Sequence, residues 1–138
     1  VSIMMTPLDV HYQKAPLEST LIESYYEKGR FLNAMKKGKT MNSTFQNEYL
    51  SSLFKTPENY RFRVIQIAGF VARRIVNYLQ PEQTVKQWEI IGLIKLGSQV
   101  SVVLDHNFEV LAKVGDKVID GETIIAKKLP PQVSEITQ

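Results

Sequence analysis

The chain has 138 residues, 43% of them hydrophobic, and a formal net charge of +3. A chain of this length and composition can bury the core of one domain, which excludes a disordered protein, and no apolar run approaches the roughly 20 residues of a membrane-spanning helix. It contains two histidines and no cysteine, and the absence of cysteine excludes disulfides, thiolate metal sites and a cysteine nucleophile. Its basic residues are too scattered along the sequence for a nucleic-acid-binding patch.

Most of the chain is predicted to form short strands separated by turns. Residues 21–26 and 50–55 are rich in strand-forming side chains, and the turn-forming tetrapeptide Thr56-Pro57-Glu58-Asn59 follows the second of them. Residues 60–68 then alternate imperfectly between apolar and polar side chains. We therefore expect residues 50–55 and 60–68 to pair as an antiparallel hairpin closed near residues 57–59.

Two segments, 16–33 and 108–126, share the order strand, glycine turn, strand. In the second segment Gly115 and Gly121 stand where tight turns need a positive φ. This half-motif is similar to that of biotinyl and lipoyl domains. The predicted fold is therefore mostly β, a duplicated barrel-sandwich-like domain with short helical elements.

The remaining segments complete this prediction. Residues 36–46 are polar and are predicted to form a loop. Residues 70–79 fit either a strand or a short helical turn, and we favour neither strongly. Residues 1–129 are predicted to form a single domain, and residues 130–138 a flexible tail.

The Gly97-Ser98 dipeptide has the chemistry that self-cleavage requires. The serine hydroxyl can attack the carbonyl of Gly97, because glycine presents no side chain to block the approach. The ester that results can eliminate the upstream chain and leave dehydroalanine, which hydrolyses to a pyruvoyl group. Most Gly-Ser dipeptides are ordinary turns, so the neighbouring residues must decide between the two interpretations.

Four blocks of the sequence resemble segments of the phosphatidylserine decarboxylase family, in particular its short bacterial and archaeal type, and they occur in the same order. They are Met-Thr-Pro-Leu-Asp-Val-His at residues 5–11, Gly-Arg-Phe-Leu-Asn-Ala at 29–34, Gln-Ile-Ala-Gly-Phe-Val-Ala-Arg-Arg-Ile at 66–75 and Gly-Leu-Ile-Lys-Leu-Gly-Ser at 92–98. The family is pyruvoyl-dependent, so the resemblance favours the self-cleavage interpretation of Gly97-Ser98.

The resemblance implies a catalytic site and a cofactor. Ser98 would be the precursor of the pyruvoyl group, with cleavage between Gly97 and Ser98, and neither a metal ion nor pyridoxal phosphate would be needed. The pyruvoyl carbonyl would form a Schiff base with the amine of phosphatidylserine, and loss of CO₂ would give phosphatidylethanolamine. His11 would donate a proton to the decarboxylated carbon, because an imidazole titrates near working pH. We expect His11 within about 10 Å of Ser98.

The same resemblance implies how the substrate is reached. Phosphatidylserine would be met in a membrane surface, with Phe31, Leu32 and Met35 contacting the lipid. The protein would be peripheral on the cytoplasmic membrane, as in the bacterial type, as a monomer or a homo-oligomer, and would have no nucleic-acid partner.

The chain also departs from the family pattern. The family's upstream acidic segment, of the form Pro-Ala-Asp-Gly, is not among the 138 residues, so the chain is interpreted as N-terminally truncated and is expected to stay uncleaved. Asn47-Glu48-Tyr49 stands where many members have Asn-Glu-Arg, so one cation is missing there.

Two alternatives come from other functional classes. Ala34-Met35-Lys36-Lys37 is similar to a biotin acceptor sequence and favours a biotinyl or lipoyl carrier module, although Lys36 follows Gly29 too closely for a hairpin tip. The other alternative is a noncatalytic lipid-binding scaffold. The second histidine, His106, is predicted to lie in a surface turn.

Overall fold

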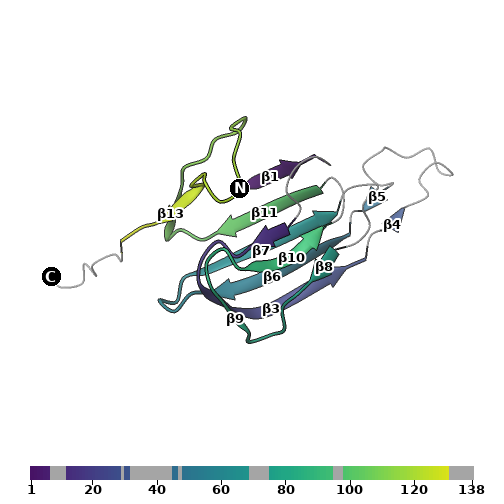
Figure 1. Ribbon diagram of the computed structural model, residues 1–138, viewed down its shortest axis with the longest axis horizontal. Helices are drawn as coiled ribbons and strands as arrows, with labels where there is room; N and C mark the ends of the chain where they lie inside the picture. Colours follow the sequence, from purple (N-terminus) through teal and green to yellow (C-terminus); the bar gives the residue numbers. More distant parts are fainter. Residues whose placement is uncertain are drawn as a thin grey trace.

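The computed structural model describes residues 1–6, 12–28, 30–31, 45–46, 48–68, 75–94 and 98–130 (Figure 1). These residues form strands and turns and contain no helix, which confirms the predicted mostly-β class. Within the same residues there is accordingly no helix of the length and apolarity that crossing a membrane requires.

The strands of the described residues lie in four sheets. The large sheet has the order β1 (Ser2–Met5), β11 (Ser98–Leu104), β7 (Arg61–Ala68), β6 (Tyr49–Lys55), β3 (Ser19–Glu27) and β9 (Thr84–Val85). The small sheet has the order β2 (Tyr12–Lys14), β10 (Ile90–Ile94) and β8 (Ile75–Asn77). Two further pairs are β12 (Phe108–Val110) with β13 (Ala126–Lys128), and β4 (Arg30–Phe31) with β5 (Phe45–Gln46). Every pairing between these strands is antiparallel.

The predicted hairpin is confirmed as β6 and β7, with Tyr49 opposite Ile67 at one end and Lys55 opposite Arg61 at the other. The turn closes through the Asn59 amide, which donates to the carbonyl of Thr56 over 2.9 Å. Asn59 has a φ of 72°, which asparagine tolerates better than most residues. Local turn chemistry therefore sets the register of the two central strands.

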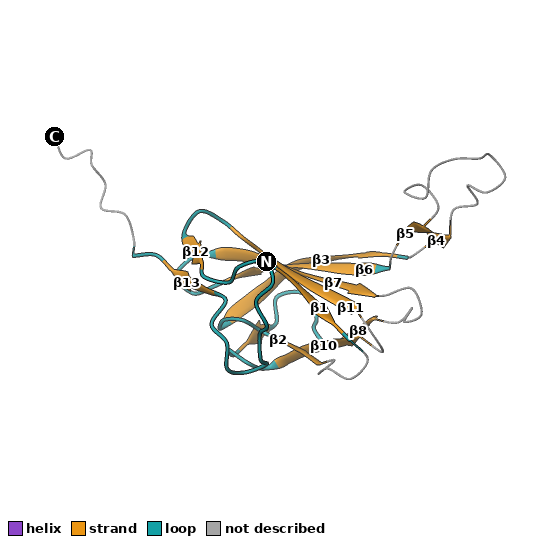
Figure 2. Cartoon of the chain, turned by 90° about the horizontal axis from the view of Figure 1, so that it is seen from above, coloured by secondary structure: helices purple, strands orange, loops and turns teal. Residues whose placement is uncertain are grey.

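The core lies between the two sheets. Figure 2 shows the small sheet as a second layer beneath the large one. Phe54 and Phe62 are directly opposite each other in β6 and β7, and their rings stack with centroids 5.3 Å apart. Each is at most 2% exposed, and burial of one such ring contributes roughly 2–3 kcal/mol. The remaining members of this buried cluster are Ala15, Leu21, Val64, Leu79, Val85 and Ile91.

The structure does not confirm the duplicated barrel-sandwich or the short helical elements. β3 pairs with β6 and β9 of the large sheet, whereas β4 pairs with β5, so residues 16–33 do not form a strand pair of their own. Residues 108–126 behave differently, because their one described ladder joins β12 to β13. Similar strand and glycine signals therefore lead to different pairings, because pairing partners are chosen by the whole fold.

The predictions for the turns, the loop and the tail are confirmed only in part. Gly115 and Gly121 have φ values of 94° and 75°, as the tight turns required. Within residues 70–79, β8 is a strand, while residues 70–74 lie outside the described residues. In the predicted loop, residues 45–46 form β5 and residues 36–44 lie outside. The single domain with a separate tail stays a prediction, because residues 131–138 are also outside.

Candidate active site

Ser98 is the first residue of β11, and the strands on both sides hold its backbone. It lies opposite Met5 of β1 and opposite Ala68 of β7. Figure 1 shows β1, β7 and β3 ending, and β11 and β6 beginning, at this same end of the large sheet. Position 98 is therefore anchored from two sides in the ladder, although Gly97 lies outside the described residues.

The row of residues that contains Ser98 continues across the sheet to a carboxylate. The amide of Ala68 donates to the backbone carbonyl of Glu48 over 2.9 Å, which places Glu48 beside the start of β6. We call Met5, Ser98, Ala68 and Glu48 the Ser98 row. Ala68 is itself a buried core residue, and Glu48 is two residues from the buried Leu50, so both belong to the face that covers the small sheet.

Glu48 is buried and is held by a tyrosine. The residue is 8% exposed, and the hydroxyl of Tyr26 donates to its Oε2 over 2.5 Å. This hydrogen bond, followed by desolvation and by the carboxylate charge, raises the pKa of Tyr26 above its ordinary value. The phenol therefore stays protonated at neutral pH and remains the donor to Glu48.

A buried pair of amides ties the two sheets together next to the Ser98 row. Nε2 of Gln66, on β7, donates to Oε1 of Gln13, on β2, over 2.8 Å, and both side chains are at most 5% exposed. Gly92 of β10 lies opposite Gln13, at a point where any side chain would collide with its surroundings. A Cβ at position 92 would come within 2.6 Å of Nε2 of Gln66 and 2.7 Å of the carbonyl oxygen of Val76.

Replacing Gly92 with alanine should therefore destabilise the fold by about 3 kcal/mol, through overpacking and the loss of a buried amide hydrogen bond. Urea unfolding followed by circular dichroism measures this change. Ser24→Ala, on an exposed part of β3, is the control and should change the stability by less than about 0.5 kcal/mol. Equal stability of Gly92→Ala and wild type would contradict the close packing at position 92.

Several predicted site residues lie outside the described residues. They are His11, Leu32, Met35, Lys36 and Gly97. The backbone of Phe31 pairs with Phe45 between β4 and β5, but its side chain is not among those described. The proximity of His11 to Ser98 therefore stays a prediction. The described residue that follows His11 in the chain is Tyr12, which lies opposite Leu93 in the small sheet.

The predicted surface turn at His106 is confirmed. His106 is exposed between Asp105 and Asn107, and the amide of Asn107 donates to Oδ1 of Asp105 over 2.8 Å. Asp105 follows the last residue of β11, at the opposite end of that strand from Ser98. His106 therefore has no place in the site built around Ser98.

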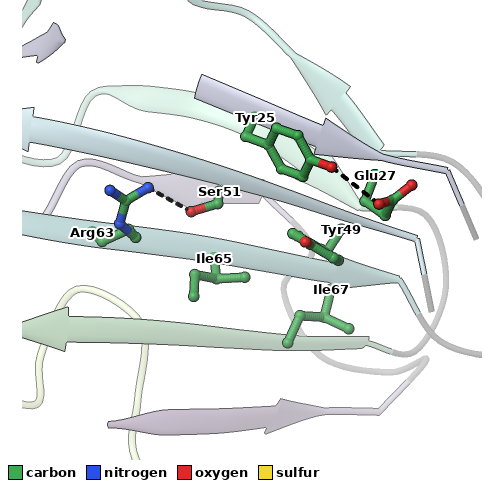
Figure 3. A pocket seen from close by; sticks show the side chains of 7 residues that line it. All are labelled: Tyr25, Glu27, Tyr49, Ser51, Arg63, Ile65 and Ile67. Atoms are coloured by element: carbon green, nitrogen blue, oxygen red, sulfur yellow. Dashed lines mark hydrogen bonds between the residues drawn. The ribbon is translucent and has the colours of Figure 1, made fainter. Parts of the chain in front are cut away.

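An open hollow of about 730 Å³ lies on the other face of the large sheet (Figure 3). The guanidinium of Arg63 donates to Oγ of Ser51 over 2.9 Å at one side, and the hydroxyl of Tyr25 donates to Glu27 over 3.1 Å at the other. Its remaining lining residues are Tyr49, Ile65 and Ile67. Successive side chains of a strand point to opposite faces of the sheet, and Ile67 is next in sequence to Ala68. The hollow therefore lies on the opposite face from the Ser98 row.

Sequence reasoning missed the role of the buried polar groups. In the sequence, Glu48 was distinguished only by the missing cation beside it, and Gln66 only by its place in a block that resembles the decarboxylase family. A glutamate immediately before a strand carries no signal of burial, because its environment depends on β3 and β7, which are distant in sequence. The four-block pattern likewise contains no indication that Gln13 and Gln66 would meet.

Comparison with known proteins identifies the family. The family model for phosphatidylserine decarboxylase matches residues 1–126. A protein described as a putative archaetidylserine decarboxylase proenzyme, from Methanothermobacter thermautotrophicus, is 40% identical over 130 residues, which are 94% of this chain and 56% of that protein. No solved structure matches the chain.

Two bacterial relatives give the same result. A phosphatidylserine decarboxylase proenzyme from Geobacter sulfurreducens is 34% identical over 91% of this chain and 56% of its own length. Another, from Wolbachia sp. subsp. Brugia malayi, is 37% identical over 91% of this chain and 53% of its own length. The chain thus spans just over half the length of these relatives. The match over residues 1–126 and the agreement among these relatives show that the chain belongs to the phosphatidylserine decarboxylase family.

Proposed function

We propose that this chain is the part of a phosphatidylserine decarboxylase that forms the pyruvoyl group, with Ser98 as its precursor and the Gly97–Ser98 bond as the cleavage site. The observation that carries the proposal is the place of this bond between the two sheets. β10 belongs to the small sheet and ends at Ile94, whereas β11 belongs to the large sheet and begins at Ser98. The bond therefore joins the last residue of the crossover between the two sheets to the first residue of β11.

Cleavage in this crossover is compatible with a stable fold. β10 remains paired with β2 and β8, and β11 remains paired with β1 and β7. The new N-terminus at position 98 would stay held opposite Met5 and Ala68. The residues present thus fit a pyruvoyl group at position 98. The relatives are named proenzymes, which agrees with a chain that must be processed.

A pyruvoyl carbonyl supplies an electron sink for the decarboxylation of an amine-bearing substrate. The chain's own residues would hold this position and handle protons. The ladders on both sides of β11 fix the backbone at 98, and we assign to His11 the proton that replaces the departing CO₂ on the substrate carbon.

We also propose that the protein acts at the surface of the cytoplasmic membrane, where its lipid substrate lies. Met4 supports this, because it is 73% exposed and lies opposite Gln99, at the end of the large sheet where β11 begins. The net charge of +3 favours anionic lipid surfaces, although weakly. Phe31, Leu32 and Met35 are proposed to contact the lipid.

Denaturing mass spectrometry of the natural full-length protein tests the proposal. We expect two fragments that meet at Gly97/Ser98, the second with a carbonyl-capped N-terminus. The same protein should sediment with vesicles that contain phosphatidylserine and release CO₂ from them. An intact chain with no CO₂ release would instead favour the noncatalytic lipid-binding alternative, and a biotinylated Lys36 would favour the carrier module.

A further inference from the structure

A buried carboxylate in the Ser98 row has no role in the function proposed above. Glu48 is more than nine-tenths buried, and the hydroxyl of Tyr26 donates to one of its oxygens. Within the described ranges, no group donates a hydrogen bond to Oε1 of Glu48, and no cationic side chain lies within ion-pair distance of the carboxylate. One oxygen of a buried carboxylate is thus left without a protein partner among these residues.

Such a group calls for a cationic partner. Burial of an ionised carboxylate is costly unless it is both paired and hydrogen-bonded, and a neutral phenol supplies only one of these two requirements. An ammonium group from a ligand would supply the other, because it brings a positive charge and N–H donors for the free oxygen. The chemistry of Glu48 therefore selects an organic ammonium rather than an anion.

The position of Glu48 relates this ammonium site to position 98. Ala68 lies between Ser98 and Glu48 in the row, so two strand spacings, about 10 Å, separate the two backbones. The hydroxyl of Tyr26 reaches Oε2 from β3, which flanks β6 on the side away from β7 and β11, so an ammonium on Oε1 would have to lie over Ala68 to approach position 98. The small side chain of Ala68 leaves the way between them less obstructed than a larger side chain would.

We propose that Glu48, held in place by Tyr26, binds the ammonium group of a serine headgroup and so presents the substrate amine to the reacting carbon at position 98. The serine headgroup is common to phosphatidylserine and archaetidylserine, the lipids that the relatives' names specify. The inference rests on the proposed function, which supplies the substrate class. It adds the substrate-binding residue and the group of the substrate that this residue recognises.

Binding to an uncleavable protein tests the proposal separately from catalysis. In the natural full-length protein carrying Ser98→Ala, soluble dihexanoyl phosphatidylserine should bind at least about tenfold more weakly after Glu48→Gln, because a charge-assisted hydrogen bond is lost. The N-acetylated lipid has no ammonium group, and its affinity should be unchanged by the same substitution. Isothermal titration calorimetry measures both affinities.

The chain offers a matched control on the opposite face. Glu27 also accepts a hydrogen bond from a tyrosine, Tyr25, but it lines the open hollow rather than the Ser98 row. Glu27→Gln should therefore leave the affinity for phosphatidylserine within about twofold. Tyr26→Phe, which keeps the carboxylate but removes its donor, should weaken binding by about threefold.

A failure of the role of Glu48 can be distinguished from a failure of the proposed decarboxylase function. In the cleavable protein, Glu48→Gln should leave the two fragments at Gly97/Ser98 unchanged and raise KM for phosphatidylserine. Equal weakening for the acetylated and unmodified lipids, or no weakening for either, would overturn the role of Glu48 even if cleavage and CO₂ release were normal. Selective weakening for the unmodified lipid would support it even if no CO₂ were released. A loss of fold in Glu48→Gln, seen by circular dichroism, would also overturn it, because removal of a buried charge that has no cationic partner among the described residues should not destabilise the protein.

Discussion

Replacing Ser98 with alanine should abolish both chain cleavage and decarboxylation in the natural full-length protein. Alanine supplies neither the oxygen that attacks the carbonyl of Gly97 nor the group that must be eliminated to form dehydroalanine. We expect a single intact mass and no CO₂ from phosphatidylserine vesicles. Ser98→Cys should retain slow cleavage, because a thiolate can make the equivalent acyl shift.

Ser101→Ala is the matched control for this experiment. Ser101 lies on the same strand, and its hydroxyl is hydrogen-bonded to that of Ser2 over 2.8 Å on the exposed face of the sheet. Its removal should leave cleavage and CO₂ release close to the wild-type values. Two fragments at residues 97 and 98 in Ser98→Ala would show that the assignment of the pyruvoyl precursor is wrong.

Replacing His11 with glutamine should lower the rate of decarboxylation by about 10²- to 10⁴-fold, the range that a positioned general acid contributes. Glutamine keeps hydrogen-bonding capacity but cannot donate a proton at neutral pH. We expect the two fragments to form as in wild type, so the loss should appear in CO₂ release alone. Steady-state kinetics on phosphatidylserine vesicles, together with intact mass, measure the two effects separately.

His106→Gln provides the comparison, because His106 lies in an exposed turn at the far end of β11. This substitution should leave the rate unchanged. A His11→Gln protein that decarboxylates at the wild-type rate would remove the imidazole from the reaction, and another proton donor near the Ser98 row would then be needed.

If Glu48 binds the substrate ammonium, the residue that binds the amine and the residue that reacts with it both belong to the Ser98 row. The ladder from β1 to β7 would fix the reacting position, and Glu48, immediately before β6, would present the carboxylate that holds the amine. Because the row is perpendicular to the strands, the separation of the two positions is determined by sheet geometry rather than by loop conformation. Site residues on paired strands are positioned more precisely than site residues on loops.

Features that depend on neighbouring residues could be predicted from the amino-acid sequence. The hairpin of β6 and β7 follows from the Thr56-Pro57-Glu58-Asn59 turn between two strand-forming runs, and Gly115 and Gly121 indicated positive φ because few other residues tolerate it. The resembling blocks indicated the family, which the match over residues 1–126 confirms. In each case the information lies within a short stretch of chain.

Which distant segments meet became known only from the folded arrangement. Residues 16–33 and 108–126 carry similar local signals, yet β3 joins the large sheet while β12 pairs with β13, so the duplicated architecture did not follow. Likewise, Glu48 is buried because β3 and β7 flank the start of β6, and its place in the Ser98 row depends on the pairing of β7 with β11. Pairing between distant strands depends on how the whole chain buries its apolar faces, and no local pattern contains that information.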